Sequence, residues 1–153
     1  MISIHDKTLQ DIEFYTVLQQ VSELCITDLG RIEALKIKPY STSENVLQSL
    51  QFTNEYVSSF YNDNRIPNHG FEPITKEIKL LKIENSYLET KSFQKIASIT
   101  ITVTNILKFL KKFEEYYPNI YKSTTSIEIV AHLIIEIDAI IDRFGDVKDN
   151  ATD

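Results

Sequence analysis

The sequence predicts an all-α protein, a multi-helix bundle of about six helices forming a single helical domain over residues 1–153. Along most of the chain, apolar residues recur at spacings of three and four, the period of one helix face. Only 3 Gly and 4 Pro interrupt the 153 residues, so long uninterrupted elements are expected. Hydrophobic residues make up 42% and charged residues 25%, a globular balance that differs from that of a disordered chain.

An apolar stripe and a capping residue predict the first two helices. The first stripe, expected to face inward, comprises Phe14, Val17, Leu18, Val21, Leu24 and Cys25. Because Cys25 lies on it, we expect a small buried core residue rather than a reactive thiol. Thr27 is a good N-cap for the next helix, and Asp28 suits the positive end of its dipole. Pro39 ends that helix, whose inward residues are Leu29, Ile32 and Leu35.

A capping box predicts the start of the third helix, because Ser41 and Glu44 have the spacing S-x-x-E. Its inward stripe comprises Val46, Leu47, Leu50, Thr53, Val57 and Phe60. The periodicity then stops over residues 62–73, where two prolines, a glycine and three asparagines predict a loop. A short helix should follow, with an apolar side formed by Ile74, Ile78 and Leu81.

Residues 93–117 should form the longest helix, which Pro118 ends. Its seam comprises Ile96, Ile99, Val103, Ile106, Leu110, Phe113 and Tyr117. Residues 98–104 also alternate like a strand and are rich in β-branched side chains. We prefer the helix because the three-four phase runs unbroken through them. Such a seam can pair with a helix of the same chain or of another chain, and packing within the chain is the favoured reading.

A last helix is expected from Ile127 to Phe144, with Gly145 as the residue that ends it. Its stripe comprises Ile127, Val130, Ile134, Ile137, Ile141 and Phe144. Other apolar residues lie off this stripe, namely Ile129, Leu133 and Ile140. The helix is therefore apolar on more than one side, so it should be central or covered by something outside this chain.

No catalytic, cofactor-binding or metal-ligating constellation is found, so the chain itself is expected to be no enzyme. A Walker loop and a dinucleotide fingerprint both need paired glycines. The glycines here stand singly, at Gly30, Gly70 and Gly145. The histidines share no motif with one another: His5, His69 and His132. His69 and Arg65 fall in the predicted loop, where solvated side chains are expected because no convergent partner accompanies them.

A calcium loop is the one metal site that the spacing of acidic residues suggests. A twelve-residue window holds Asp142, Asp146, Asp149 and Asp153. However, Phe144 and Val147 occupy positions that require a ligand and a glycine, and the terminal Glu is missing. Asp138 and Asp142 are therefore read as the solvated face of the last helix.

Charge and cysteine content narrow the classes of partner. The net charge of −6 argues against a broad face that grips a phosphate backbone. A small basic patch at Lys108, Lys111 and Lys112 can touch nucleic acid, but an i, i+4 pair between Lys111 and Glu115 is the favoured reading. A single cysteine excludes an internal disulfide and a cysteine-built zinc site. The start of the chain lacks a signal-peptide pattern and no stretch is long enough to span a bilayer, so a cytoplasmic protein is predicted.

Several stretches resemble the core (lever) region of the MutS family of DNA-binding ATPases. The first follows the family order of a Thr, a Gly three residues on, a short helix, a Pro and an apolar-striped helix: Thr27, Gly30, Leu35, Pro39 and 46–50. The most specific stretch is 140–152, which is similar to the family's Ile-Asp-x-x-Gly-x-Val-x-Asp-x-Ala-Ser/Thr segment. The short Gly-to-Pro segment and the absence of Trp resemble the second bacterial branch, MutS-II. Smaller agreements are Phe14-x-x-Val17-Leu18, Thr53-x-Glu55 and the loop 67–70.

This resemblance implies an N-terminal core piece of a MutS-II protein, without the clamp, ATPase and nuclease domains. Its implied role is that of a non-catalytic structural lever. The full-length family implies ATP and Mg as cofactors, a homodimer, DNA binding, often endonuclease activity, and control of recombination or DNA repair. The ribosome, through rescue of collided ribosomes, is a second implied target. The implied partners are the missing clamp and ATPase domains, with DNA or ribosome reached through the parent protein and no membrane.

Two other functions stay open. One is a stand-alone helical module for protein–protein interaction, dimerising through the seam at 96–117. The other, least favoured, is a small helical enzyme or metal protein.

Overall fold

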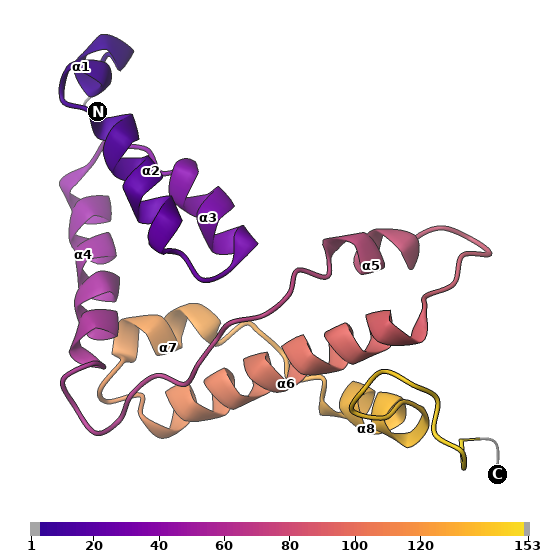
Figure 1. Cartoon of the computed structure of the whole chain (residues 1–153). Helices are drawn as coiled ribbons and strands as arrows, with labels where there is room; N and C mark the ends of the chain where they lie inside the picture. The colour runs from indigo at the N-terminus through magenta and orange to yellow at the C-terminus, as the bar shows by residue number, and fades with distance from the viewer. Residues whose placement is uncertain (1–3, 152–153) are drawn as a thin grey trace. The chain divides into compact units, whose positions relative to one another are not determined.

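The computed structural model describes residues 4–151, and within this range the chain forms eight helices and no strand (Figure 1). The all-α class predicted from the sequence is therefore confirmed. The chain divides into two compact units, one ending at Asp63 and one beginning at Asn64. The single domain over 1–153 stays a prediction. No helix of the described residues is long and apolar enough to cross a membrane.

The first unit contains four helices: α1 (Asp6–Asp11), α2 (Phe14–Leu24), α3 (Asp28–Leu35) and α4 (Ser43–Ser58). α2 lies alongside α3, and α1 packs on α2 (Figure 1). Thr27 is the N-cap of α3, as predicted, and its Oγ1 accepts a hydrogen bond of 3.0 Å from the Gly30 N–H. Gly30 lies so close to this cap that a Cβ there would stand 3.1 Å from the Thr27 hydroxyl.

Two expectations for the first unit are wrong, and one helix was not expected at all. α1 was not predicted, because its six residues are too few to show a helical period. The capping box at Ser41 does not form. The N-cap of α4 is Thr42, whose Oγ1 accepts from the Asn45 N–H at 3.4 Å. Ser and Thr are both good N-caps, so the spacing alone did not choose between adjacent residues. α3 ends at Leu35, ahead of Pro39.

The inward faces predicted for the first unit are also only partly correct. Leu18 of α2 and Ala34 of α3 are buried, and the two helices pack on one another. Most of the predicted stripes are instead exposed, including Leu24 at 84% of its surface. The exposed members are Val17, Val21, Leu24, Leu29, Ile32, Leu35, Val46, Leu47, Leu50, Val57 and Phe60. The period identified the helices but did not show whether this chain covers their apolar sides.

The second unit contains α5 (Thr75–Leu80), α6 (Thr90–Lys112), α7 (Pro118–Thr124) and α8 (Ala131–Ile140). The loop predicted over 62–73 and the short helix after it are both confirmed. α6 has 23 residues and includes 98–104, so the choice of helix over strand is confirmed. α8 packs on α6, with Ile96, Ile137 and Ile141 at the centre of their contact.

The far end of α6 is closed by aromatic residues. Leu110 is 1% exposed, and Tyr117, which follows the helix, is fully buried. The Tyr117 hydroxyl donates a hydrogen bond to the carbonyl of Asn64. The Phe109 ring lies 4.7 Å from that of Phe113 and 5.9 Å from that of Tyr117. These contacts attach the start of the second unit to the end of its longest helix.

Several predicted boundaries in the second unit are wrong. α6 ends at Lys112, so Glu115 is no longer on its surface, and no Lys111–Glu115 ion pair occurs among the described residues. Pro118 begins α7 instead of only ending a helix, since a first-turn proline needs no N–H partner. α8 is shorter than the predicted 127–144 and ends in extended backbone at Ile141. Gly145 therefore lies beyond the helix, in a turn.

Candidate functional site: an exposed interaction surface

The histidines are far apart in the chain and in three different settings. His5 precedes α1 as its N-cap, and His132 lies exposed in the first turn of α8. His69 lies half-buried in the loop, with Nδ1 3.1 Å from the carbonyl of Pro67. Within residues 4–151, no group of three or more His, Cys, Asp or Glu side chains is placed to hold a metal ion. Asp153 of the predicted acidic window lies outside the described residues.

Cys25 is not the core residue that the stripe predicted. It follows the last residue of α2 as the C-cap, in extended backbone, and it is half-buried. Its Sγ donates to the Val21 carbonyl at 3.4 Å. The thiol therefore lies between the end of α2 and the start of α3, close to Gly30. A Cβ added at Gly30 would lie 3.8 Å from the sulfur.

The segment that carries the resemblance forms a closed turn after α8. The Asp142 carboxylate accepts hydrogen bonds from the backbone N–H groups of Phe144, at 2.8 Å, and Asp146, at 2.9 Å. An antiparallel bridge joins Ile141 to Val147 across the turn. The positive φ of Gly145, +87°, lets the chain reverse, and the Gly145 N–H bonds the Asp142 carbonyl at 3.1 Å. Thr152, the last residue of the motif, lies outside the described residues.

The turn fixes the charge state of Asp142. The backbone N–H of Asp146 is the largest cause holding the pKa of this carboxyl below its ordinary value of 3.8. The N–H groups of Phe144 and Gly145 and the charge of Lys148 lower that pKa further, while burial opposes them. Asp142 is therefore a structural residue of the turn. The reading of this aspartate as part of a solvated helix face is wrong, because α8 has already ended.

An exposed cation–aromatic pair stands at the tip of this turn. The Arg143 guanidinium lies 4.6 Å from the centre of the Phe144 ring, and Phe144 is 63% exposed. Gln94 of α6 donates a hydrogen bond to the Arg143 carbonyl, which ties the turn to α6.

The basic patch on α6 is small and partly engaged. The Lys112 ammonium lies 5.0 Å from the centre of the Phe113 ring. On the other side of the unit, Lys95 of α6 forms an ion pair of 3.0 Å with Glu72. This bond to Glu72 is the largest cause that raises the pKa of Lys95, and the charge of Glu77 adds to it. These cations serve contacts within the unit and do not form a stripe.

The burial of Glu77 on α5 had no signal in the sequence. Its side chain is buried although its neighbours Ile78 and Leu80 are exposed, and its Oε2 has no hydrogen-bond partner among the described residues. A buried carboxylate oxygen normally has such a partner. α5 therefore turns a polar residue toward the unit and an apolar side away from it.

Exposed apolar surface is the largest feature of the chain. In the part that the structure describes, many more large hydrophobic side chains are exposed than buried. Close packing joins α1 to α2, α2 to α3, and α6 to α7 and α8, while α4 takes part in none of these pairs. α8 exposes Ile135 at 71% besides burying Ile137, so it is apolar on more than one side, as predicted. A helix face that leaves several large apolar side chains exposed is a candidate protein interface.

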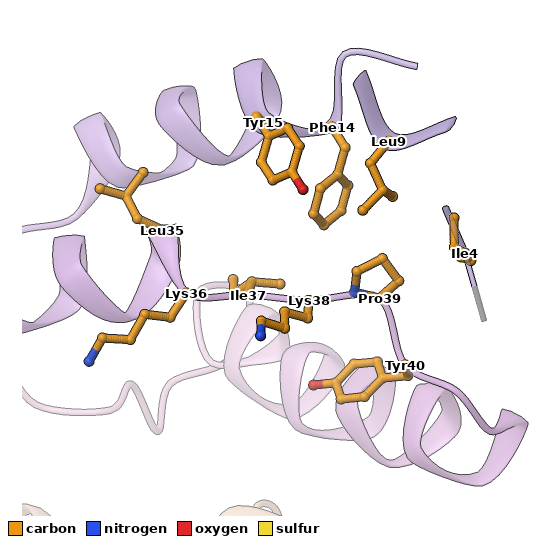
Figure 2. Close-up of a pocket in the computed structure, with 10 residues that line it drawn as sticks. All are labelled: Ile4, Leu9, Phe14, Tyr15, Leu35, Lys36, Ile37, Lys38, Pro39 and Tyr40. Carbon is orange, nitrogen blue, oxygen red and sulfur yellow. The ribbon is translucent and has the colours of Figure 1, made fainter. Parts of the chain in front are cut away.

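A pocket of about 320 Å³ opens in the first unit (Figure 2). One side is formed by Leu9 and Phe14, which extend from α1 and α2 toward Pro39 (Figure 2). The other side is the segment that joins α3 to α4, residues 36–40. The sequence carried no sign of this pocket. Its residues come from helix ends and from a connection, where the spacing of apolar residues does not predict which side chains pack together. Its volume falls at the lower end of the range for ligand pockets.

Polar groups frame the pocket. The Tyr15 hydroxyl donates to Asp6 Oδ1 at 2.5 Å, and this hydrogen bond is the largest cause that raises the pKa of Tyr15. The Lys36 ammonium forms an ion pair of 2.8 Å with Glu33. Lys38 lines the pocket without an ion pair to any described residue.

No model of a known protein family matches this chain, and no solved structure matches it significantly. Curated relatives do match. The chain is 23% identical over 151 residues to the Endonuclease MutS2 of Alkaliphilus oremlandii (strain OhILAs). It is 25% identical over 150 residues to that of Finegoldia magna, and 29% identical over 156 residues to that of Staphylococcus carnosus (strain TM300).

These matches cover 95–97% of this chain but only 19% of each relative, so the chain spans about one fifth of their length. The resemblance to the MutS-II family, which the sequence motifs predicted, is confirmed by these relatives.

Proposed function

We propose that this chain is a non-catalytic helical lever module of a MutS2-like protein. One observation carries the proposal: nearly the whole chain aligns with one fifth of each MutS2 endonuclease. An alignment that covers nearly all of this chain and a small part of each relative is expected if the chain corresponds to one part of a longer protein. The module relays motion between parts of that protein and performs no chemistry of its own.

The distribution of apolar side chains supports a role inside a larger assembly. α4 carries an exposed apolar stripe and takes part in none of the close helix pairs of the first unit, and α8 is apolar beyond its contact with α6. Further domains of the same protein would cover these faces. Covering them is favourable because it removes apolar side chains from water. A rigid helix such as α6, 23 residues or about 35 Å long at 1.5 Å per residue, is suited to transmitting displacement.

At the level of the whole protein we propose ATP with Mg as cofactor, a homodimer, and DNA as the main target. The name of the relatives supports endonuclease activity for the parent protein. The net charge of −6 fits a module that reaches DNA, or the ribosome as the second proposed target, through other domains.

The test is an immunoprecipitation from the organism's own cells with an antibody raised against this chain. We expect the precipitate to hydrolyse ATP in the presence of Mg and to retain DNA. Antibody blocked beforehand with the purified chain is the control and should precipitate neither activity. A precipitate that contains the chain but no ATPase would overturn the lever role.

The alternative is a stand-alone module that dimerises through the seam of α6. The structure gives this seam partners inside the chain, because Ile96 packs on α8 and Leu110 is buried at the other end. A dimer through the same residues would have to displace those contacts. We therefore prefer the lever module. A purified chain that sediments as a dimer, and becomes monomeric when Ile99 or Ile106 is replaced by Glu, would favour the alternative.

A further inference from the structure

The pocket between α1, α2 and residues 36–40 has a floor and a wall suited to one large apolar side chain. Leu9 is buried, and it lies with Phe14 on one side of the pocket, with Pro39 on the opposite side (Figure 2). Its volume of about 320 Å³ accommodates an aromatic side chain with part of its flanking backbone. Exposed Ile37 and Tyr40 continue the apolar surface along the connection. Flanking residues of a polypeptide can lie along these two exposed side chains, which a compact small molecule would leave uncovered.

The residues that line the pocket include two lysines and no acidic side chain. Acidic side chains outnumber basic ones in the residues up to 63, yet the segment 36–40 carries two lysines. Lys36 is already paired with Glu33, so Lys38 is the cation left for a partner. The nearby Asp6 carboxylate accepts hydrogen bonds from Tyr15 and Gln10 and keeps its charge, but it does not line the pocket. An arriving carboxylate therefore finds its attraction at Lys38 and repulsion over most of the remaining surface.

We propose that this pocket is a docking site for an acidic polypeptide segment that inserts one aromatic side chain. The aromatic ring enters between Leu9, Phe14 and Pro39. A Glu or Asp next to it in the segment pairs with Lys38. The burial of the ring supplies most of the affinity, and the ion pair sets which segments bind. The site goes beyond the lever role and does not depend on it.

The chain has no tryptophan, which gives a direct test with the full 153-residue protein. A capped peptide of sequence Ser-Glu-Trp-Glu-Gly-Ser carries the only indole in the sample. Its fluorescence should shift to the blue and saturate as the protein is titrated in. The version with Ala in place of Trp has no fluorescence of its own, so its binding is measured by how well it displaces the Trp peptide. We expect its affinity to be at least tenfold weaker than that of the Trp peptide. A Lys-Trp-Lys version should also bind more weakly.

Lys38→Glu is the decisive variant and Lys7→Glu its matched control, since Lys7 is an exposed α1 lysine that does not line the pocket. We expect Lys38→Glu to weaken binding of the acidic peptide about fivefold or more, and Lys7→Glu to change it less than twofold. Lys38→Gln should give an intermediate loss. Circular dichroism of the variants should match that of the unchanged protein, because position 38 lies in an exposed connection.

Three results would overturn the proposal. The first is no saturable binding of the acidic Trp peptide. The second is equal affinity of the Lys38→Glu and Lys7→Glu variants for it. The third is binding of free indole-3-acetate as tight as that of the peptide, which would make the pocket a small-molecule site. None of these results depends on the ATP hydrolysis that tests the lever role. The docking site and the lever role can therefore fail separately.

Discussion

Single polar side chains close the two sharpest joints of the chain. Thr27 caps α3 through its bond to the Gly30 N–H, where the chain turns from α2 into α3. Asp142 performs the same task after α8, where its carboxylate gathers the N–H groups of Phe144 and Asp146. In both places one oxygen satisfies backbone donors that would otherwise have no partner. A single substitution at Thr27 or Asp142 can therefore measure how much each joint contributes to the free energy of unfolding.

Thr27→Ala should lower the free energy of unfolding by about 1 kcal/mol, because the Gly30 N–H loses its acceptor. Urea denaturation followed by circular dichroism measures the change. Thr27→Ser retains the hydroxyl and should remain close to the unchanged protein. If Thr27→Ala and Thr27→Ser are equally stable, the cap contributes nothing and the assignment is wrong.

Acid should selectively weaken the turn that Asp142 holds. Its pKa is lower in the folded chain than its ordinary value of 3.8, so its contribution to stability is fully present above that value and is lost as pH falls through the folded pKa. Asp142→Asn has no such titration. The difference in unfolding free energy between the unchanged protein and Asp142→Asn should be constant near neutral pH and shrink below about pH 4. A difference that does not vary with pH would contradict this role.

At the scale of elements, the helical period located six of the eight helices, and helix ends were where it failed. The unbroken phase through 98–104 correctly outweighed β-branched composition, because packing on α7 and α8 supports α6 throughout. α1 and α7 were missed because each is shorter than two full periods or begins at a proline. The prediction that Gly145 ends the last helix was wrong, because α8 ends at Ile140 and Gly145 lies in the turn that follows.

The candidate surfaces show what sequence alone could not supply. A three-four stripe looks the same whether its partner is in the same chain or in another, which is why the stripe of α4 was expected to be buried. The pocket had no sequence signal at all, because Leu9 and Pro39 are brought together by tertiary structure. The turn at 141–147 was different. Its motif was recognised by resemblance, and the structure supplied the reason for Asp142 and Gly145.

The exposure of α4 predicts an asymmetry between two leucines. Leu110→Ala should lower the unfolding free energy of the purified chain by about 2–5 kcal/mol, since this side chain is 1% exposed. Leu50→Ala should change it by less than about 0.5 kcal/mol, since Leu50 is 59% exposed. Chemical denaturation of the two variants compares them directly. Equal losses would show that α4 is packed within the isolated chain.

Gly145→Ala should destabilise the turn by about 1 kcal/mol or more. A Cβ would force a side chain into a left-handed backbone of φ +87° and stand 3.0 Å from Gln94 Oε1. Thermal unfolding should show the loss. Asp146→Ala is the control, because it changes an exposed side chain in the same turn while keeping the backbone N–H that Asp142 binds. A Gly145→Ala variant as stable as Asp146→Ala would refute the conformational requirement.

At the scale of the whole molecule, the chain has ordered helices but leaves much of their apolar surface uncovered. Each unit has its own buried residues, centred on Leu18 and Ala34 in the first and on Ile96 and Ile137 in the second. Neither set includes a member of the α4 stripe, and Ile135 of α8 stays exposed. Together with the alignment of 95–97% of the chain to 19% of each MutS2 relative, this surface is the reason for proposing a module that functions inside a longer protein.

The size of the native product in its own cells tests this central proposal most directly. A denaturing gel of whole-cell extract, blotted with an antibody to this chain, gives that size in one step. Because the chain spans 19% of its relatives, we expect a band about five times larger than 17.7 kDa. A single band at 17.7 kDa would contradict the lever module and leave a chain that works through its exposed surfaces alone.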